Sequence, residues 1–519
     1  MHSRRRFLAS AGGLAVATIL APASLDQALA GTRRLRRFGE ASFPDGVISG
    51  DPTPDGAVLW TRLGGVDGSG SVQVEVAKDP GFRKVVATKN IATNEARNFT
   101  AKAAVKGLEP HERYFYRFVT QTSNSPVGRF QTALPAGSKE TVRFAFFSCQ
   151  EYTFGYYNAH ALMAKDDLDF VLNLGDYIYS DRFFGPPQGV RAANFTTSMG
   201  FTAITLDEYR QRYQVYRSDK NLRRLHAQFP MISCWDDHEV QDDYSGGDPT
   251  GGTVSGDPYT PQRRADAYRA FFEQMPTFPI GTSRLYHRAG FGKTLELFVL
   301  DERQYRASNP CGDKPGPPCA DLDAPRTMLG TAQLPFLQSG LTTSKATWKV
   351  IANEVIMSVL KADATSLADY DAWDGYPVER EAILSTVAKT EGVVFASGDY
   401  HTTIVSDVQR HDGTTVAPEF GGISMTSFSD AEVAAITGRP GYGTPDNPTI
   451  PPDQLQTILS ANPWFTDYDP IHHGYVRCEA SSSQFKATVR KLETVRQVTT
   501  ALASEDTYTV KRGQRGVKG

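Results

Sequence analysis

Six short apolar runs, each about the length of a β-strand, end in side chains of the kinds that bind metal ions. The run Phe170–Leu174 is nearly continuous in apolar residues, as in a strand buried on both faces of a largely parallel sheet. Gly175 and Asp176 follow at once, and Tyr179 lies three residues further on. A carboxylate at the end of a buried strand is unfavourable unless it is paired or binds a metal. Taken alone, Asp176 is equally compatible with a plain cap of the next helix.

The other five runs repeat this arrangement. In open α/β sheets, ligands bind in the crevice beyond the carboxyl ends of the strands. Because six strand ends carry ligand-type side chains, the sequence predicts one site with more than one metal ion. The five ends carry Ser148 and Cys149; Asp236, Asp237 and His238; Asp301, Glu302 and Arg303; Asn353 and Glu354; and Asp399 and His401.

The order of these strand ends resembles a known superfamily. Gly175, Asp176 and Tyr179 match the GD-x-x-Y element of calcineurin-like metallophosphoesterases and purple acid phosphatases, but Cys149 stands where the first motif has aspartate. The altered set closely resembles the PhoD-type alkaline phosphatases, over nearly the whole chain after residue 30. The segments that carry this resemblance are GVISGDP and LWTR near the N-terminus, then FSCQ, NLGDYIY, WDDHEV, LDERQYR, ANEV, SGDYH and HHGY.

The resemblance implies a site for Fe(III) and Ca²⁺. Cys149 and Tyr179 would bind iron, with His401 as a further candidate, and Asp176 would bridge the metals. A thiolate and a phenolate together form an anionic donor set that suits a ferric ion.

The calcium side of the expected site would use oxygen donors alone, which are the ligands that Ca²⁺ takes. In the purple phosphatases the positions of Asn353 and Asp399 hold histidines, and the exchange of imidazole for oxygen moves the preference toward harder cations. The expected metal ligands are therefore Cys149, Asp176, Tyr179, Asp237, Asn353, Asp399 and His401.

Three more residues near the strand ends have open roles. His238 could be a ligand, an orienting residue or a proton donor, and we expect it to be catalytic. Arg303 and Arg306 could clamp phosphate through charge-assisted hydrogen bonds, or could pair with nearby acids. Arg303 is the candidate substrate-binding residue.

The N-terminus has the pattern of a twin-arginine signal. Arg4, Arg5 and Arg6 precede a weakly apolar stretch at 8–21, which is too short to span a membrane, and an A-x-A cleavage pattern occupies 28–30. We expect residues 1–30 to be read by the twin-arginine export machinery. The mature protein would then be exported to the periplasm or the extracellular space, with no transmembrane segment.

The remainder divides into two expected domains. Short strands separated by glycine, proline and asparagine predict a small β-sandwich over residues 31–137. From residue 138 to 510, strands alternate with segments of helical periodicity, such as 262–275. This alternation predicts an α/β metallophosphoesterase core of sheets sandwiched by helices. Residues 511–519 are basic and glycine-rich, and we expect a flexible tail.

The positions of the cysteines and the net charge restrict the possible disulfides and binding partners. Cys311 and Cys319 flank a loop rich in proline and glycine, and form the expected disulfide in an oxidising compartment. Cys234 lies in an apolar strand and is expected in the core, whereas Cys478 has no evident role. The formal net charge of −3 gives no support to a nucleic-acid-binding surface.

The predicted function is a secreted, metal-dependent alkaline phosphatase. It would hydrolyse phosphate monoesters by attack of a metal-bound hydroxide and release inorganic phosphate. A phosphodiesterase or phospholipase D-like enzyme on the same site is the alternative. A non-catalytic exported binding protein is disfavoured, because such a protein would not need ligand-type residues at six strand ends.

Overall fold

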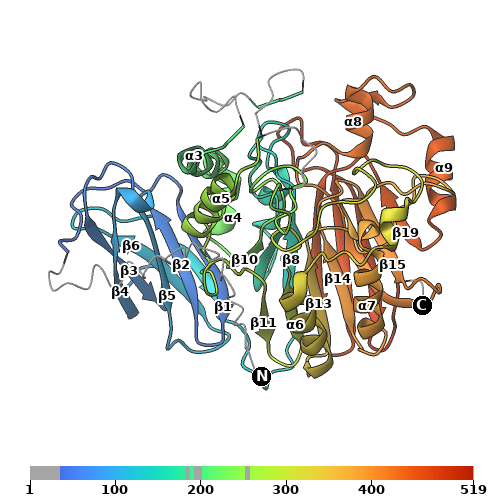
Figure 1. The fold of residues 1–519 in the computed structure, drawn as a ribbon. Coiled ribbons are helices and arrows are strands. Elements are labelled where there is room, and N and C mark those ends of the chain that lie inside the picture. The colour runs from blue at the N-terminus through green and yellow to red at the C-terminus, as the bar shows by residue number, and fades with distance from the viewer. Residues whose placement is uncertain (1–34, 182–187, 192–201, 252–257, 518–519) are drawn as a thin grey trace, which may run out of the picture.

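The structure is a computed structural model, and it describes residues 35–181, 188–191, 202–251 and 258–517 (Figure 1). The expected signal at residues 1–30 lies outside the described residues. None of the helices in the described part reaches the length and apolarity that crossing a membrane requires.

A nine-stranded mixed sheet forms one half of the core, in the order β22-β21-β20-β8-β9-β10-β1-β2-β5. Strands β8, β9 and β10 are parallel neighbours, so their carboxyl ends meet at one edge. The five residues of β9 are all buried, as expected for a strand covered on both faces. The bounds are β1 Val47–Thr53, β2 Gly56–Arg62, β5 Thr100–Val105, β8 Val142–Phe147, β9 Phe170–Leu174, β10 Met231–Cys234, β20 Gly474–Ala480, β21 Gln484–Leu492 and β22 Leu502–Lys511.

A seven-stranded sheet forms the other half, in the order β11-β12-β13-β14-β16-β15-β19. Its central strands β12, β13, β14 and β16 are parallel, and three of them carry predicted ligand-bearing ends. The bounds are β11 His287–Phe291, β12 Leu295–Val299, β13 Trp348–Asn353, β14 Val393–Ser397, β15 Thr403–Gln409, β16 Thr415–Gly421 and β19 Phe465–Asp469.

The two sheets pack face to face, with helices outside. Phe170 of β9 stacks on Phe291 of β11 with ring centroids 4.4 Å apart, and Trp348 of β13 meets Phe485 of β21 at 5.6 Å. Figure 1 shows α3, α4 and α5 beside the first sheet, and α6 and α7 beside the second. The described helices are α2 Asn158–Met163, α3 Leu206–Tyr216, α4 Lys220–His226, α5 Pro261–Gln274, α6 Gly330–Thr343, α7 Pro377–Val387, α8 Asp430–Ile436 and α9 Pro452–Ala461, and a small hairpin joins β17 Gly443–Thr444 to β18 Asn447–Pro448.

The predicted helical segments form helices. Helix α5 lies within one residue of the predicted 262–275 at each end, and Pro261 occupies its first turn, where no backbone donor is needed. In α3 the tyrosines Tyr209, Tyr213 and Tyr216 recur at helical spacing and are fully buried in the core. Thr205 begins α3 with a capping box that it forms with Glu208.

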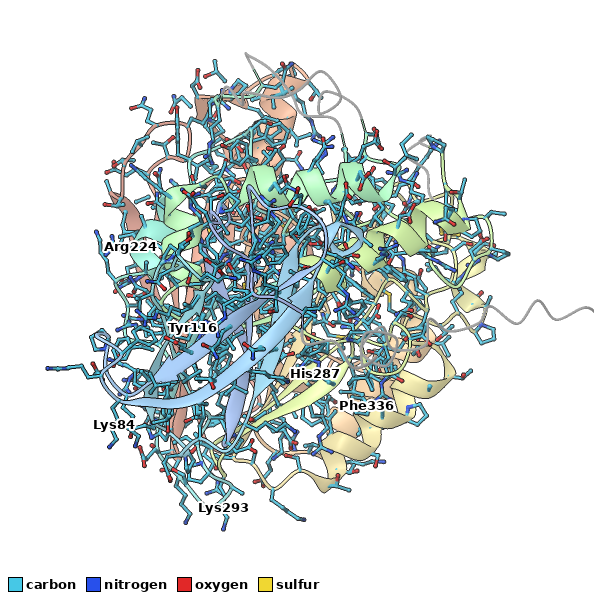
Figure 2. All side chains as sticks on the ribbon, turned by 90° about the vertical axis from the view of Figure 1, so that its left-hand side faces the viewer. Lys84, Tyr116, Arg224, His287, Lys293 and Phe336 are labelled. Carbon is cyan, nitrogen blue, oxygen red and sulfur yellow. A yellow bond between two sulfur atoms is a disulfide. The ribbon has the colours of Figure 1, made fainter. Side chains whose placement is uncertain are left out.

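The N-terminal domain is a β-sandwich that shares a sheet with the core. Its second sheet, in the order β4-β3-β6-β7, packs against β1, β2 and β5 through an apolar core that includes Val74 and Tyr116. Figure 2 looks onto this domain, with Tyr116 and Lys84 labelled. Strand β1 joins β10 in parallel through the pair Gly50 and Met231, so the sandwich extends the nine-stranded sheet of the core. The remaining bounds are β3 Gly70–Ala77, β4 Val85–Thr93, β6 Arg113–Val119 and β7 Gly128–Gln131.

The prediction of a flexible tail is wrong for residues 511–517. Strand β22 runs to Lys511, and the Val517 amide donates to Asp407 Oδ1 at 2.6 Å. Arg515 donates to the carbonyl oxygen of Val387 at 3.3 Å, at the end of α7, where a helix favours a cation. A Cβ on Gly516 would lie 2.6 Å from the Asp407 side chain, so glycine at this position permits the close approach.

The cysteine predictions agree with the structure. Cys311 and Cys319 form a disulfide with Cα atoms 5.7 Å apart. Cys149, Cys234 and Cys478 are free and buried.

Candidate metal centre

The predicted ligands from the two sheets meet at one place. Asp176 and Asp237 each belong to more than one of the groups whose ligand atoms lie close together, so the groups form one continuous cluster. Within each of the following groups, the ligand atoms lie within 4.8 Å of one another: Cys149, Asp176 and His401; Asp176, Asp237 and His238; Asp236, Asp237 and Asp399.

Four residues of this cluster have a left-handed backbone. The φ angle is 57° at Cys149, 52° at Asp176, 67° at Asp399 and 56° at His401. Non-glycine residues adopt this region at a free-energy cost of about 1–3 kcal/mol each. The turns at Cys149, Asp176 and Asp399 come two residues after a strand, and His401 comes two residues before β15. The chain therefore bends sharply at the sheet edge and keeps its ligand-type side chains there.

We call Cys149, Tyr179 and His401 the thiol–phenol half. The Tyr179 hydroxyl donates to Asp176 Oδ2 at 2.7 Å and lies 3.1 Å from His401 Nε2. His401 Nδ1 lies 3.0 Å from the carbonyl oxygen of Phe428, which can only accept, so this nitrogen carries the proton. The lone pair of His401 Nε2 therefore faces Tyr179, as in a histidine that is oriented to bind a metal.

Burial sets the protonation of this half. It raises the pKa of the Cys149 thiol and the Tyr179 phenol well above their usual values, and the nearby Asp176 adds to both shifts. Burial also lowers the pKa of His401 to about 3, so the imidazole is neutral. A bound cation would act in the opposite sense on the thiol and the phenol, because it stabilises a thiolate and a phenolate.

We call Asp236, Asp237 and Asp399 the carboxylate half, and a buried arginine lies among them. Arg303 is fully buried and its Nε contacts Asp236 while its Nη1 contacts Asp371. Its Nη2 lies 3.0 Å from Asp399 Oδ1 and 3.7 Å from Asp237 Oδ1. These contacts favour the alternative in which Arg303 pairs with acids, and its role in binding substrate stays a prediction.

The donor set fits metal ions. Among the described residues, Asp176 Oδ1, Asp236 Oδ2 and Asp237 Oδ1 are buried without a hydrogen-bond partner. A buried carboxylate oxygen without a partner is unfavourable, and such atoms call for an explanation. Here three such oxygens lie beside a thiol, a phenol and a neutral imidazole. Cations bound between these groups would explain why the oxygens have no hydrogen-bond partner.

His238 lies at the edge of the cluster, with 16% of its side chain exposed. Its Nδ1 is 2.6 Å from Asp181 Oδ2, and its ring stacks on Tyr179 with centroids 4.0 Å apart. Burial alone lowers the pKa of His238, but Asp237, Asp176 and Asp181 outweigh it and hold the pKa well above the usual value. The described contacts therefore suit a protonated imidazole that is held in place by Asp181.

Asn353 is buried close to the cluster, but its amide has other partners. Its Oδ1 accepts from Trp373 Nε1 at 3.1 Å, and its Nδ2 donates to Val355 O and to Ser397 Oγ. Its role as a calcium ligand stays a prediction. Arg306 also pairs with an acid, because its Nη2 lies 2.5 Å from Asp371 Oδ1.

The sequence did not indicate the residues that support the cluster from behind. Glu239 is buried and accepts from the backbone amides of Asp176 at 3.0 Å, Tyr177 at 2.7 Å and Asp236 at 2.7 Å. It therefore connects the ends of β9 and β10, and its position in the WDDHEV segment was the available signal. Asp371, in contrast, lies in a loop with no sequence signal.

Comparison with known proteins finds relatives over nearly the whole chain. The PhoD-like phosphatase family matches residues 144–489, and the N-terminal domain of PhoD-like phosphatases matches residues 28–134. Alkaline phosphatase D of Bacillus subtilis (strain 168) is 34% identical over 543 aligned positions, which cover 99% of this chain and 88% of that protein.

Solved structures give the same result for the fold. A structure of PhoD matches with a TM-score of 0.81 and 32% identity, covering 93% of this chain and 92% of that chain. The purple acid phosphatase PPD1 from yellow lupin (Lupinus luteus) seeds has a TM-score of 0.56 at 13% identity, covers 91% of this chain and 75% of its own, and shares the fold. Both family domains match, and a relative aligns over nearly the whole length of this chain. The chain therefore belongs to the PhoD-like phosphatase family and is a phosphoester hydrolase.

Proposed function

We propose that this chain is an exported, metal-dependent alkaline phosphatase that releases inorganic phosphate from phosphate monoesters. The observation that carries the proposal is the single cluster in which strand ends of both sheets bring together a thiol, a phenol, an imidazole and carboxylate oxygens that have no hydrogen-bond partner. The twin-arginine pattern at residues 1–30 supports export.

The two halves suit different metals. The thiol–phenol half favours Fe(III), since a thiolate and a phenolate are strong anionic donors, and its neutral imidazole adds a third ligand. The carboxylate half offers oxygen donors and favours Ca²⁺. Asp176 lies in both the group with Cys149 and the group with Asp237, which supports its role as the bridge.

The metals would neutralise the phosphoryl oxygens and supply a nucleophilic water for in-line displacement. In that displacement, water forms a bond to phosphorus while the bond from phosphorus to the ester oxygen breaks. The Nε2 proton of His238 goes to the leaving oxygen, so that an alcohol departs and phosphate remains. Asp181 accepts from the other ring nitrogen and keeps the imidazole in the required orientation.

A turnover panel with metal analysis tests this proposal. Phosphate monoesters and diesters are assayed with metal-loaded protein, with and without a calcium chelator, and bound metals are quantified. We expect monoester turnover that the chelator abolishes and added Ca²⁺ restores, together with stoichiometric iron. Faster turnover of diesters would favour the phosphodiesterase alternative, and full activity of a protein whose only metal is zinc would contradict the assignment.

A further inference from the structure

The segment Ser424 to Phe428, between β16 and α8, is bonded to the strand end that carries Cys149. The amide of Met425 donates to the carbonyl oxygen of Ser148 at 3.0 Å. The amides of Thr426 and Ser427 donate to the carbonyl oxygen of Cys149 at 3.2 and 3.1 Å. The backbone of this segment therefore holds the backbone at Cys149 in place.

The Ser427 hydroxyl contacts the phenol of the same half. Its Oγ accepts from the amide of Glu151 at 3.2 Å, so its own hydrogen is free to be donated elsewhere. Tyr179 Oη lies 2.6 Å away, and both side chains are buried. The next residue completes the set, because the Phe428 carbonyl oxygen accepts from His401 Nδ1 at 3.0 Å.

A chain of buried hydrogen bonds holds the segment from the far side. Ser424 Oγ donates to the carbonyl oxygen of Ser427 at 2.7 Å and lies 2.9 Å from His473 Nδ1. His473 Nε2 lies 2.9 Å from Glu432 Oε2 in the first turn of α8. His473 belongs to the HHGY motif, for which the proposed reaction has no use, and this contact gives that motif a role.

We propose that Ser427 is a positioning residue that donates a hydrogen bond to the phenolate oxygen of Tyr179 in the metal-loaded protein. The inference rests on the proposed function, because it requires a metal bound to Tyr179. A Tyr179 phenolate that bound a metal would have lost to solvent the proton that the hydroxyl now donates to Asp176 Oδ2. Ser427 then remains as the hydrogen-bond donor to the phenolate among the described contacts.

Such a hydrogen bond has a spectroscopic consequence. A donor on the phenolate oxygen withdraws electron density from it, so transfer of an electron from the phenolate to Fe(III) requires more energy. Loss of the donor should therefore shift the visible charge-transfer band to longer wavelength. Groups that hydrogen-bond to metal ligands typically contribute a factor of about 10–100 in metal affinity or activity.

The test compares Ser427→Ala with Ser429→Ala as a matched control. Ser429 lies two residues away and caps α8 by accepting from the Glu432 amide at 3.4 Å, so its loss perturbs the same segment without removing the bond to Tyr179. We expect a shift of the band to longer wavelength and a roughly 10–100-fold weaker retention of iron for Ser427→Ala. Ser429→Ala should keep the band position, and Ser427→Thr, which restores a hydroxyl, should return it.

A measurement on unaltered protein makes the test independent of how the variants fold. Resonance Raman excitation in the charge-transfer band should show a phenolate C–O stretch that moves in D2O, because the hydrogen bond exchanges. Equal band positions in wild type and Ser427→Ala, or a C–O stretch that ignores D2O, would overturn the role of Ser427 while leaving the metal site intact. A wild-type protein that binds iron without a phenolate band would overturn both this inference and the proposed iron site.

Discussion

The two halves of the candidate metal centre stabilise buried polar groups in different ways. The thiol–phenol half is built from groups that are neutral without a cation, and backbone carbonyls and hydroxyl groups hold them in place. The carboxylate half is built from acids around the fully buried guanidinium of Arg303. Preorganisation by neutral hydrogen bonds suits an ion that is bound once and retained. Acids around an internal cation suit an ion that exchanges.

This difference predicts separate responses to substitution. Loss of a hydrogen bond in the thiol–phenol half should weaken metal binding and leave the fold intact. Loss of charge balance in the second half should affect the stability of the protein itself, because buried acids would be left without a counter-ion.

The largest effect is expected for Asp176→Asn, which removes the carboxylate that the two halves share. Activity should fall by orders of magnitude and both metals should be depleted, because a neutral amide cannot hold two cations together. Folding should change little, since β9 still buries its apolar side chains. Metal content, turnover and thermal unfolding measure this. No helix begins at Asp176 in the structure, so a silent variant would mean that this carboxylate does not hold metal ions.

Next in size is Cys149→Ser, which breaks the thiol–phenol half alone. Activity and colour should be lost, because an alcohol is a far poorer anionic donor than a thiol. Cys234→Ala is the matched control: Cys234 is also a fully buried cysteine at the end of a parallel strand. It should keep its turnover and lose about 1–2 kcal/mol of stability to a small cavity. The reverse pattern would contradict the division into halves.

Arg303→Met tests the carboxylate half. In metal-free protein the free energy of unfolding should fall by about 3–5 kcal/mol, since buried acids lose their cation. Added Ca²⁺ should recover much of this loss and should stabilise the variant more than the wild type. Chemical denaturation with and without calcium measures both effects. Arg83→Met, at a side chain that is 89% exposed, is the control and should change neither. A variant as stable as wild type without calcium would refute the counter-ion role.

The smallest effect concerns the acids behind the carboxylate half. Burial raises the pKa of Glu302 to about 8, from a usual value of 4.5. Between these values the folded chain keeps a proton that the unfolded chain releases, so the stability contributed by this group falls as pH rises through that window. In metal-free protein, Glu302→Gln should reduce the decrease of the unfolding free energy with pH by about 1 kcal/mol per pH unit. Denaturation at pH 5–8 measures the slope, with exposed Glu40→Gln as control. An unchanged slope would contradict the assignment.

Much of the fold and the cluster could be predicted because strands carry their own signal. The apolar runs predicted strands β8, β9, β10, β12, β13 and β14. Because these strands are parallel neighbours within their sheets, their carboxyl ends lie together at one edge. Cys149, Asp176, Asp237, Asp399 and His401 follow these runs directly, so their convergence follows from the sheet order.

The support of the site could not be predicted in the same way. Ser427 and Asp371 reach the cluster from loops, where no periodicity fixes the position of a side chain. Arg303 was placed at the right strand end, but the sequence does not say whether a guanidinium faces phosphate or buried acids. The docked tail was missed because its basic, glycine-rich composition resembles that of a frayed end, whereas its contacts depend on the end of α7 and on Asp407.

We expect the left-handed turns at Cys149, Asp176, Asp399 and His401 to distinguish related chains that are enzymes from those that are not. Each turn is one that glycine adopts without strain, so substitution by glycine would remove the ligand and relax the backbone in one step. A descendant freed from selection for catalysis would therefore drift toward glycine at these positions and gain stability as it did so. Related sequences with several glycines there are expected to be folded proteins that have lost the chemistry.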